Sequence, residues 1–183
     1  MSVGRTVNFA ILLLCTVCGL KAGTISGYWI NATTTHNFVV GNLLTTYNNY
    51  REETNSASTY EWFDVSRIYA DSAMLTNESR YLPYVTNTYV WMNTLWDNAS
   101  TNGGYFAGSF IDGTGKSTDK YVDENSLSGN AYLDCYAVTT GTTKTNFLSS
   151  AIAIANWLIC SAQWDSTFGG GFWWNTTKQL KPT

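Results

Sequence analysis

Residues 125–138 read NSLSGNAYLDCYAV and residues 145–159 read TNFLSSAIAIANWLI, and these two consecutive segments decide the fold. Their apolar residues recur at steps of three and four, the period of an α-helix. The expected apolar positions are Leu127, Ala131, Cys135 and Val138, then Leu148, Ala151, Ile152, Ala155, Leu158 and Ile159. We expect Gly141 to end the first helix as its C′ residue and Thr145 to cap the second, so that the two form an antiparallel hairpin.

The same spacing predicts three helices upstream, over residues 37–50, 62–73 and 79–97, the last with Pro83 in its first turn. Strand alternation is nearly absent. We therefore expect an all-α chain of five amphipathic helices joined in hairpins.

The predicted helix over residues 62–73 shows two different faces. Its apolar stripe consists of Trp62, Val65, Tyr69 and Ala73, and its charged face consists of Asp64, Arg67 and Asp71 at ion-pair spacing. We expect the apolar stripe to be buried, and we assign Trp62, Trp91 and Trp96 to the core.

A glycine-rich interval, residues 98–120, interrupts the helices. We expect a long loop, with a short hairpin that pairs residues 105–106 with residues 110–111. Loops of this length inside compact domains tend to be functional, and an ordinary surface loop is the equally weighted alternative.

The amino terminus has the pattern of a secretory signal peptide. Arg5 precedes an apolar run, residues 9–17, that is too short to cross a bilayer and that ends in small residues. We assign residues 1–22 to the signal and residues 23–183 to one domain. We expect a secreted, extracellular protein with no integral membrane span, and the net charge of -3 argues against a nucleic-acid partner.

Four Asn-x-Ser/Thr triplets agree with this route, because such triplets accept N-linked sugar in a eukaryotic secretory pathway. The candidate sites are Asn31, Asn77, Asn98 and Asn175.

Cysteine and histidine usage limits the chemistry. Beyond the signal only Cys135 and Cys160 remain, and in the expected hairpin they lie about 18 Å apart, so we expect buried free thiols. His36 is the only histidine, which excludes a multi-histidine metal site. We expect no metal and no cofactor.

Asp123 and Glu124 stand side by side in a chain with few charges. Hydrolysis of a glycosidic bond uses two carboxyl groups, one that protonates the leaving oxygen and one that attacks the anomeric carbon or activates water. We expect the helix to begin near Asn125, which leaves both acids in a loop that can turn them towards one centre. The alternative is that they only complement the positive end of the helix dipole.

Trp173 and Trp174 follow three glycines and supply a second component. Sugar rings present apolar C–H faces that lie flat on aromatic rings. On an extended segment adjacent side chains point to opposite sides, so only one of these two rings can be buried in the same core. We expect a sugar platform here.

These blocks resemble glycoside hydrolase family 76, the endo-acting α-1,6-mannanases and related fungal wall proteins. The resemblance rests on Asp123-Glu124-Asn125, on residues 129–141 (GNAYLDCYAVTTG) and on residues 164–175 (WDSTFGGGFWWN), with weaker similarity back to Tyr28. It implies an (α/α)6 toroid of helical hairpins and a retaining mechanism, with Asp123 as nucleophile and Glu124 as general acid/base. It also implies substrate contacts at Tyr121, Asn125, Gly170, Trp173, Trp174 and Asn175.

The chain departs from the family pattern in three respects. The second carboxyl is normally Asp, so Glu124 is one methylene longer, and the bulky aromatics usual after the pair are replaced by Ser126, Leu127 and Ser128. Five or six helices are about half of a twelve-helix toroid. We therefore expect the first half of the ring, with part of the apolar surface of residues 148–159 uncovered, completed by a missing C-terminal half or by self-association.

The resemblance implies a retaining glycoside hydrolase or transglycosidase that acts inside α-1,6-linked mannan or a related polysaccharide. The alternative is a catalytically inactive, truncated secreted glycoprotein that binds carbohydrate or a partner.

Overall fold

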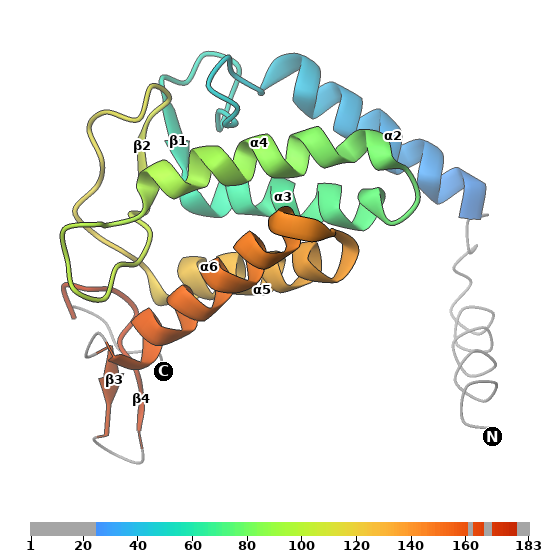
Figure 1. Ribbon diagram of the computed structural model, residues 1–183. Coiled ribbons are helices and arrows are strands. Elements are labelled where there is room, and N and C mark those ends of the chain that lie inside the picture. Colours follow the sequence, from blue (N-terminus) through green and yellow to red (C-terminus); the bar gives the residue numbers. More distant parts are fainter. Residues whose placement is uncertain (1–24, 161–162, 167–169, 179–183) are drawn as a thin grey trace, which may run out of the picture. The chain divides into compact units, whose positions relative to one another are not determined.

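The computed structural model describes residues 25–160, 163–166 and 170–178, and the predicted signal peptide, residues 1–22, lies outside them. Helices dominate the described part (Figure 1): α2 (Ile25–Asn42), α3 (Glu61–Leu75), α4 (Leu82–Met92), α5 (Val122–Val138) and α6 (Gly141–Cys160). Two 3-10 turns flank α4, η1 (Ser79–Tyr81) and η2 (Asn93–Leu95). Two antiparallel ribbons pair β1 (Ser58–Tyr60) with β2 (Gly108–Phe110), and β3 (Trp164–Asp165) with β4 (Gly171–Phe172).

The chain divides into two compact units, one up to Val40 and one from Gly41. In the second unit α3 packs against α4 and α5, and α5 packs against α6, as Figure 1 shows. A cluster of buried side chains fills the space between these helices: Val65, Ile68, Val85, Met92, Leu95, Tyr105, Ala131, Tyr132, Cys135, Phe147, Ala151 and Ile154. Across the described residues, no helix is both long and apolar enough to span a bilayer.

Helix α3 buries a different face from the predicted one. Val65 of the predicted apolar stripe is buried, but Tyr69 and Ala73 are exposed and Trp62 is 41% exposed. Asp64 and Asp71 of the predicted charged face are buried. The helical period was right and the orientation was wrong, because polar side chains of this helix find hydrogen-bond partners inside the protein.

Three donors converge on the carboxylate of Asp64. The backbone N–H of Tyr50 donates to Oδ1 at 2.6 Å, and the Thr59 hydroxyl and the Trp91 indole N–H donate to Oδ2 at 2.7 and 3.1 Å. A carboxylate with its lone pairs satisfied in this way tolerates burial. Asp64 therefore ties α3 to the loop before β1, to β1 and to α4, and the predicted burial of Trp91 is confirmed.

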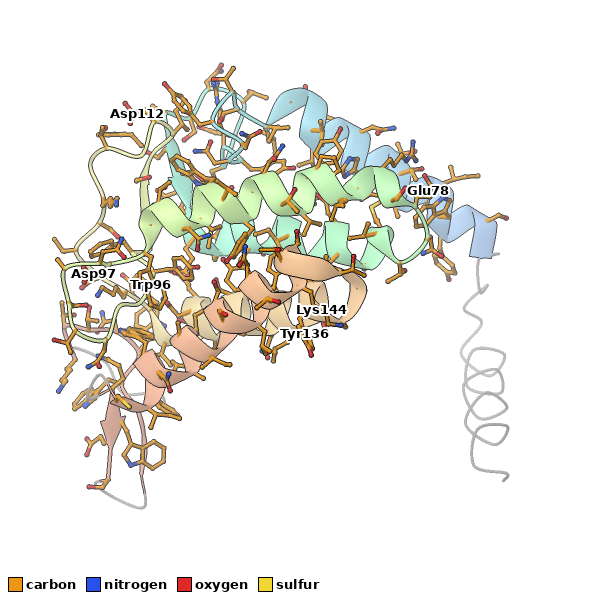
Figure 2. All side chains as sticks on the ribbon, in the orientation of Figure 1. Glu78, Trp96, Asp97, Asp112, Tyr136 and Lys144 are labelled. Carbon is orange, nitrogen blue, oxygen red and sulfur yellow. The ribbon has the colours of Figure 1, made fainter. Side chains whose placement is uncertain are left out.

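The turn between α5 and α6 is shorter than predicted. Thr139 caps α5, because its N–H and its hydroxyl both donate to the carbonyl four residues earlier, at 3.0 and 2.6 Å. Gly141, with a φ of 60°, is already the first residue of α6, so Thr145 lies inside that helix. Across the turn the Lys144 ammonium lies 4.3 Å from the centroid of the Tyr136 ring, and Figure 2 shows these two side chains together.

Helix α6 is also rotated relative to the prediction. It buries one stripe, Phe147, Ala151, Ile154 and Trp157. Ile152 and Ile159 of the predicted stripe are 52% and 67% exposed. A segment that is apolar all round does not reveal its buried face by spacing, and here the large rings decide it. The expectation that part of this helix's apolar surface is uncovered is confirmed.

Residues 37–50 do not form one helix. Helix α2 ends at Asn42, and Leu44 and Tyr50 then form an isolated antiparallel bridge. The turn between them places Asn48 at a φ of 64°, in the left-handed region that asparagine tolerates. The spacing of apolar residues predicted that the helix continues to residue 50, and the turn after Asn42 makes this prediction wrong.

The predicted hairpin inside residues 98–120 is absent from the described structure. Strand β2 pairs instead with β1, with Ser58 opposite Phe110 and Tyr60 opposite Gly108. Periodicity within a segment carries no information on a partner about 50 residues away, and this pairing brings the glycine-rich interval to the start of α3.

Cys135 and Cys160 are free thiols, as predicted. Cys135 is buried in the core between the helices. Cys160, the last residue of α6, is exposed, so the predicted burial was wrong for this residue.

Replacing Asp64 by alanine should lower the free energy of unfolding by about 3 kcal/mol, because three buried donors lose their acceptor. Tyr69→Ala, on the exposed face of the same helix, should cost less than about 1 kcal/mol. Urea denaturation followed by tryptophan fluorescence measures both values. A larger cost for Tyr69→Ala than for Asp64→Ala would contradict the orientation of α3.

Candidate active site

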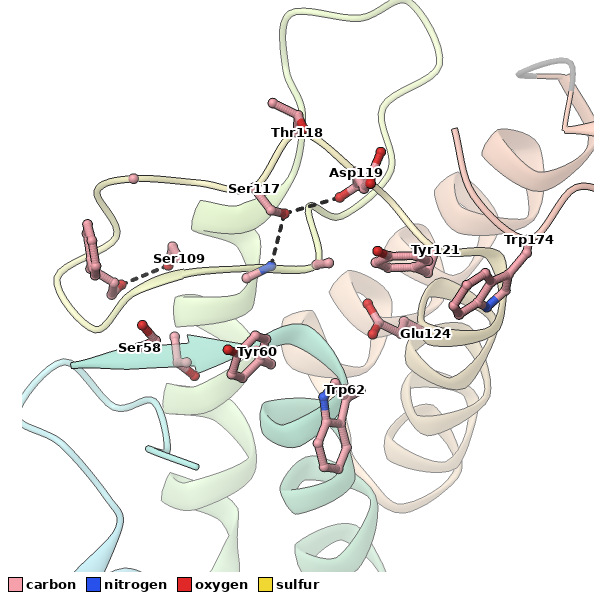
Figure 3. A pocket seen from close by; sticks show the side chains of 15 residues that line it. Ser58, Tyr60, Trp62, Ser109, Ser117, Thr118, Asp119, Tyr121, Glu124 and Trp174 are labelled. Atoms are coloured by element: carbon pink, nitrogen blue, oxygen red, sulfur yellow. Dashed lines mark hydrogen bonds between the residues drawn. The ribbon is translucent and has the colours of Figure 1, made fainter. Parts of the chain in front are cut away.

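A cleft of about 550 Å³ opens where the first turns of α3 and α5 meet the β1–β2 ribbon (Figure 3). Its lining combines aromatic, hydroxyl and acidic side chains with backbone: Ser58, Thr59, Tyr60, Trp62, Ala107, Gly108, Ser109, Phe110, Gly115, Ser117, Thr118, Asp119, Tyr121, Glu124 and Trp174. None of these described lining residues is cationic, whereas Asp119 and Glu124 are acidic. The cleft suits a neutral ligand with both apolar faces and hydroxyl groups.

Main-chain hydrogen bonds join the start of α3 to the glycine-rich interval. The N–H of Glu61 donates to the carbonyl of Ala107 at 2.9 Å, and the N–H of Ala107 donates to the carbonyl of Asp119 at 3.0 Å. Because these bonds run in series, the part of the glycine-rich interval that lines the cleft is fixed to the start of α3.

A second set of contacts joins the start of α5 to the C-terminal region. Tyr121 and Asn175 form an isolated antiparallel bridge, and the N–H of Val122 donates to the carbonyl of Trp174 at 2.8 Å. Asn175 is only 4% exposed. Its side chain is therefore placed inside the protein, whereas the bridge sets Trp174 against the cleft.

The acidic pair lies within the first turn of α5. The helix begins at Val122, with Tyr121 as its N-cap residue, and not near Asn125 as the sequence predicted. Successive side chains on a helix diverge by about 100°. Accordingly Glu124 lines the cleft, whereas Asp123 is exposed beside it.

Glu124 has the environment of a proton donor. Burial raises its pKa to about 7, and the negative charge of Asp123 adds to this effect. Its Oε2 atom is buried and has no hydrogen-bond partner within the described part of the chain. Near neutral pH this carboxyl can therefore exist in both protonation states.

Asp123 is connected to the cleft through an aromatic side chain. The indole N–H of Trp174 donates to Asp123 Oδ1 at 3.1 Å. The Trp174 ring is 38% exposed and lies 5.0 Å from the Tyr121 ring, centroid to centroid. Tyr121, Trp174 and the two acids thus form one contiguous group, of which Figure 3 shows Tyr121, Glu124 and Trp174.

Asn125, predicted to contact substrate, is fully buried. Its side-chain oxygen accepts from the Tyr105 N–H at 2.7 Å, and its amide nitrogen donates to the Tyr105 carbonyl at 3.1 Å and to Glu61 Oε2 at 3.2 Å. The Ser128 hydroxyl donates to Glu61 Oε1 at 2.8 Å. Asn125 therefore works with buried Glu61, which sequence reasoning missed, to hold the first turns of α3 and α5 together.

Gly170 and Trp173 belong to the β3–β4 ribbon and are not among the described residues that line the cleft. Gly170 has a φ of 96°, and a Cβ there would lie 2.3 Å from the Trp164 ring. The N–H of Trp173 donates to the carbonyl of Gln163 at 2.7 Å. Of the two tryptophans predicted to contact substrate, Trp174 lines the cleft and Trp173, which is partly buried, does not.

Most of the residues that line the cleft were not predicted, among them Tyr60, Trp62, Phe110 and Asp119. Trp62 was assigned to the core by its helical spacing. Nearness in sequence could have pointed to two of them. Trp62 is the second residue of α3, and Asp119 lies two residues before the predicted site residue Tyr121. Within the described residues no group of three or more His, Cys, Asp or Glu side chains is arranged to hold a metal ion.

No family model and no curated protein matches this chain. Solved structures do. A family 76 α-mannanase of Bacteroides thetaiotaomicron aligns with a TM-score of 0.66 at 17% identity, over 81% of this chain and 40% of its own. A cellobiose 2-epimerase of Bacillus thermoamylovorans aligns with a TM-score of 0.68 at 13% identity, over 86% of this chain and 42% of its own.

A D-mannose isomerase aligns with a TM-score of 0.65 at 17% identity, over 75% of this chain and 37% of its own. The fold is that of an (α/α)6 toroid. The chain spans about two fifths of the length of these neighbours, so it holds part of the ring, as predicted. At these identities the likeness shows the fold alone.

Asp123→Asn should lower the pKa of Glu124 from about 7, because a neighbouring negative charge is removed. The value should stay above that of an ordinary glutamate, since burial is the larger cause. Carbon-13 NMR of the side-chain carboxyl carbons follows the titration. Asp134→Asn, at an exposed position of α5, is the control; an equal shift in both variants would contradict the coupling.

Proposed function

We propose that this protein is a retaining glycoside hydrolase or transglycosidase that acts inside α-1,6-linked mannan or a related neutral polysaccharide. The observation that carries the proposal is the placement of Glu124, with a pKa raised to about 7, in an aromatic cleft beside Trp174 and Asp123. The polysaccharide class comes from the resemblance of residues 123–125, 129–141 and 164–175 to family 76.

In this mechanism Asp123 attacks the anomeric carbon and forms a glycosyl ester while Glu124 transfers its proton to the leaving oxygen. Glu124, now ionised, then takes a proton from water or from an acceptor hydroxyl, whose oxygen displaces Asp123. Retention requires the two carboxyl groups to act about 5 to 5.5 Å apart. The hydrogen bond from Trp174 fixes one oxygen of Asp123 and leaves the other free to attack.

The lining of the cleft supports a neutral sugar. Tyr60 and Phe110 of the β1–β2 ribbon and Trp62 of α3 are exposed, and Tyr121 and Trp174 line the cleft beside the start of α5. Rings of this kind stack on the apolar faces of sugars. The negative charges of the lining would repel a carboxylated or sulfated chain.

Carbohydrate binding without turnover is the second candidate. It is favoured by the exposure of Asp123 beside the cleft and by the engagement of its Oδ1 with Trp174. In that case the aromatic cleft would hold a sugar chain that no nucleophile reaches.

Release of reducing ends from linear α-1,6-mannan should be abolished by Asp123→Ala and by Glu124→Gln. With an aryl α-mannoside whose leaving group needs no proton, Glu124→Gln should still release the phenol, whereas Asp123→Ala should not. Because protonated Glu124 is the acid, wild-type kcat/KM on mannan should fall as the pH rises above about 7. Circular dichroism checks that the variants are folded.

Wild-type turnover in either variant would remove that residue from the mechanism. No turnover of mannan by the wild-type protein, with binding that Trp174→Ala abolishes, would select the second candidate.

We also propose that the protein is secreted and glycosylated. Expressed with residues 1–22 in a eukaryotic host, it should reach the medium without them, with sugar on Asn31, Asn77 or Asn98, which are exposed. Asn175 should be unmodified, because it is 4% exposed and its backbone pairs with Tyr121. Mass spectrometry of peptides treated with glycosidase identifies the N-terminus of the secreted protein and the asparagines that carried sugar. Retention in cells, or a folded protein with sugar on Asn175, would contradict this.

A further inference from the structure

Asp119 lies in the cleft beside the acidic pair, outside the residues that carry the family resemblance. Figure 3 shows its side chain near Tyr121, and both residues line the cleft together with Glu124. Burial and the charges of Asp119, Glu124 and Asp123 together raise the pKa of Tyr121, which agrees with the closeness of these groups.

The backbone of Asp119 is held independently of its side chain. Its carbonyl accepts from the Ala107 N–H at 3.0 Å and from the Ser117 hydroxyl at 3.2 Å. The next residue, Lys120, is anchored through its ammonium group, which donates to the Gly103 carbonyl at 2.7 Å and pairs with Asp97. The loop is therefore fixed without help from the Asp119 carboxyl.

The carboxyl of Asp119 has unused hydrogen-bonding capacity. Its Oδ1 atom is buried and finds no donor within the described part of the chain. A buried carboxylate oxygen without a donor costs stability, so such atoms in clefts are commonly completed by a ligand or by water. No described residue lining the cleft is a lysine or an arginine that could satisfy it.

The chemistry of the cleft defines the ligand group that fits. An ionised carboxylate only accepts, and its two oxygens match two neighbouring O–H donors. A sugar ring that lies on Trp174 and Tyr121 presents adjacent hydroxyls at its edge. A bound metal ion is a poorer match, because the described residues form no group of three acidic, histidine or cysteine ligands.

We propose that Asp119 is a specificity-determining residue whose carboxylate accepts hydrogen bonds from two adjacent free hydroxyls of the sugar stacked on Trp174. This inference rests on the proposed function, since it assigns a role within the same carbohydrate cleft. The inference adds that a sugar ring without two adjacent free hydroxyls binds poorly on Trp174.

Isothermal titration calorimetry with α-1,6-linked mannotriose tests the proposal, in an Asp123→Asn background so that the sugar is not consumed. Asp119→Asn should weaken binding about 10- to 100-fold, the loss expected for a hydrogen bond to a charged group. Asp134→Asn is the matched control and should bind as the background does. Because the Asp119 side chain does not hold the loop, Asp119→Asn should keep the Tm of the background.

A ligand series identifies the contact. Each mannotriose analogue lacks one ring hydroxyl. Two of the analogues, which lack adjacent hydroxyls, should bind the Asp123→Asn background weakly, and adding Asp119→Asn should not weaken their binding further. Unchanged mannotriose affinity in Asp119→Asn, alongside lost binding in Trp174→Ala, would overturn only this inference. A lowered Tm with equal losses for every analogue would also overturn it, because the residue would then be structural. If the background and the wild type bind no oligosaccharide, the proposed function and this inference fall together.

Discussion

The hydrogen bonds of Glu61 are the constraint on which the cleft depends. This carboxyl is fully buried at the first residue of α3, and it accepts from Asn125 and Ser128 in the first two turns of α5. Burial raises the pKa of Glu61 well above its usual range. These polar groups thus fix the starts of the two helices to each other. Glu124 lies between the two α5 residues that contact Glu61, and it lines the cleft. Ser128 thus has a structural role, because its hydroxyl donates to Glu61.

Helical spacing was sufficient to predict α3, α4, α5 and α6, because the signal is local, but it placed the first helix over residues 37–50, whereas α2 covers Ile25–Asn42. It was insufficient to predict which face is buried. On α3 the acidic residue Asp64 finds three donors from three other segments, and on α6 the rings of Phe147 and Trp157 outweigh the smaller residues around them. In both helices the buried face is determined by contacts with residues distant in sequence, and the sequence of the helix itself does not reveal these contacts. The β1–β2 ribbon was missed for the same reason.

The candidate site, too, was predicted where short motifs carry it and missed where distant contacts form it. Asp123, Glu124, Tyr121 and Trp174 were predicted from short motifs, and the structure brings them together. Asn125 and Asn175 belong to the same motifs but are buried. Position within a motif does not distinguish a residue that faces a ligand from one that holds a neighbouring residue in place. Trp62 and Asp119 reach the cleft only because β2 crosses to β1, so spacing alone gave them no role.

One feature of the C-terminal region bears on how the site is assembled. The aromatic wall of the cleft comes from Trp174, which follows every described helix in the chain and is joined to α5 through a backbone bridge at Tyr121 and Asn175. During translation α3 to α6 leave the ribosome first, and their core contains no atom of Trp174. The helical scaffold can therefore fold while the cleft still lacks one side, and the capacity to hold a ligand is acquired only after α3 to α6 have been made.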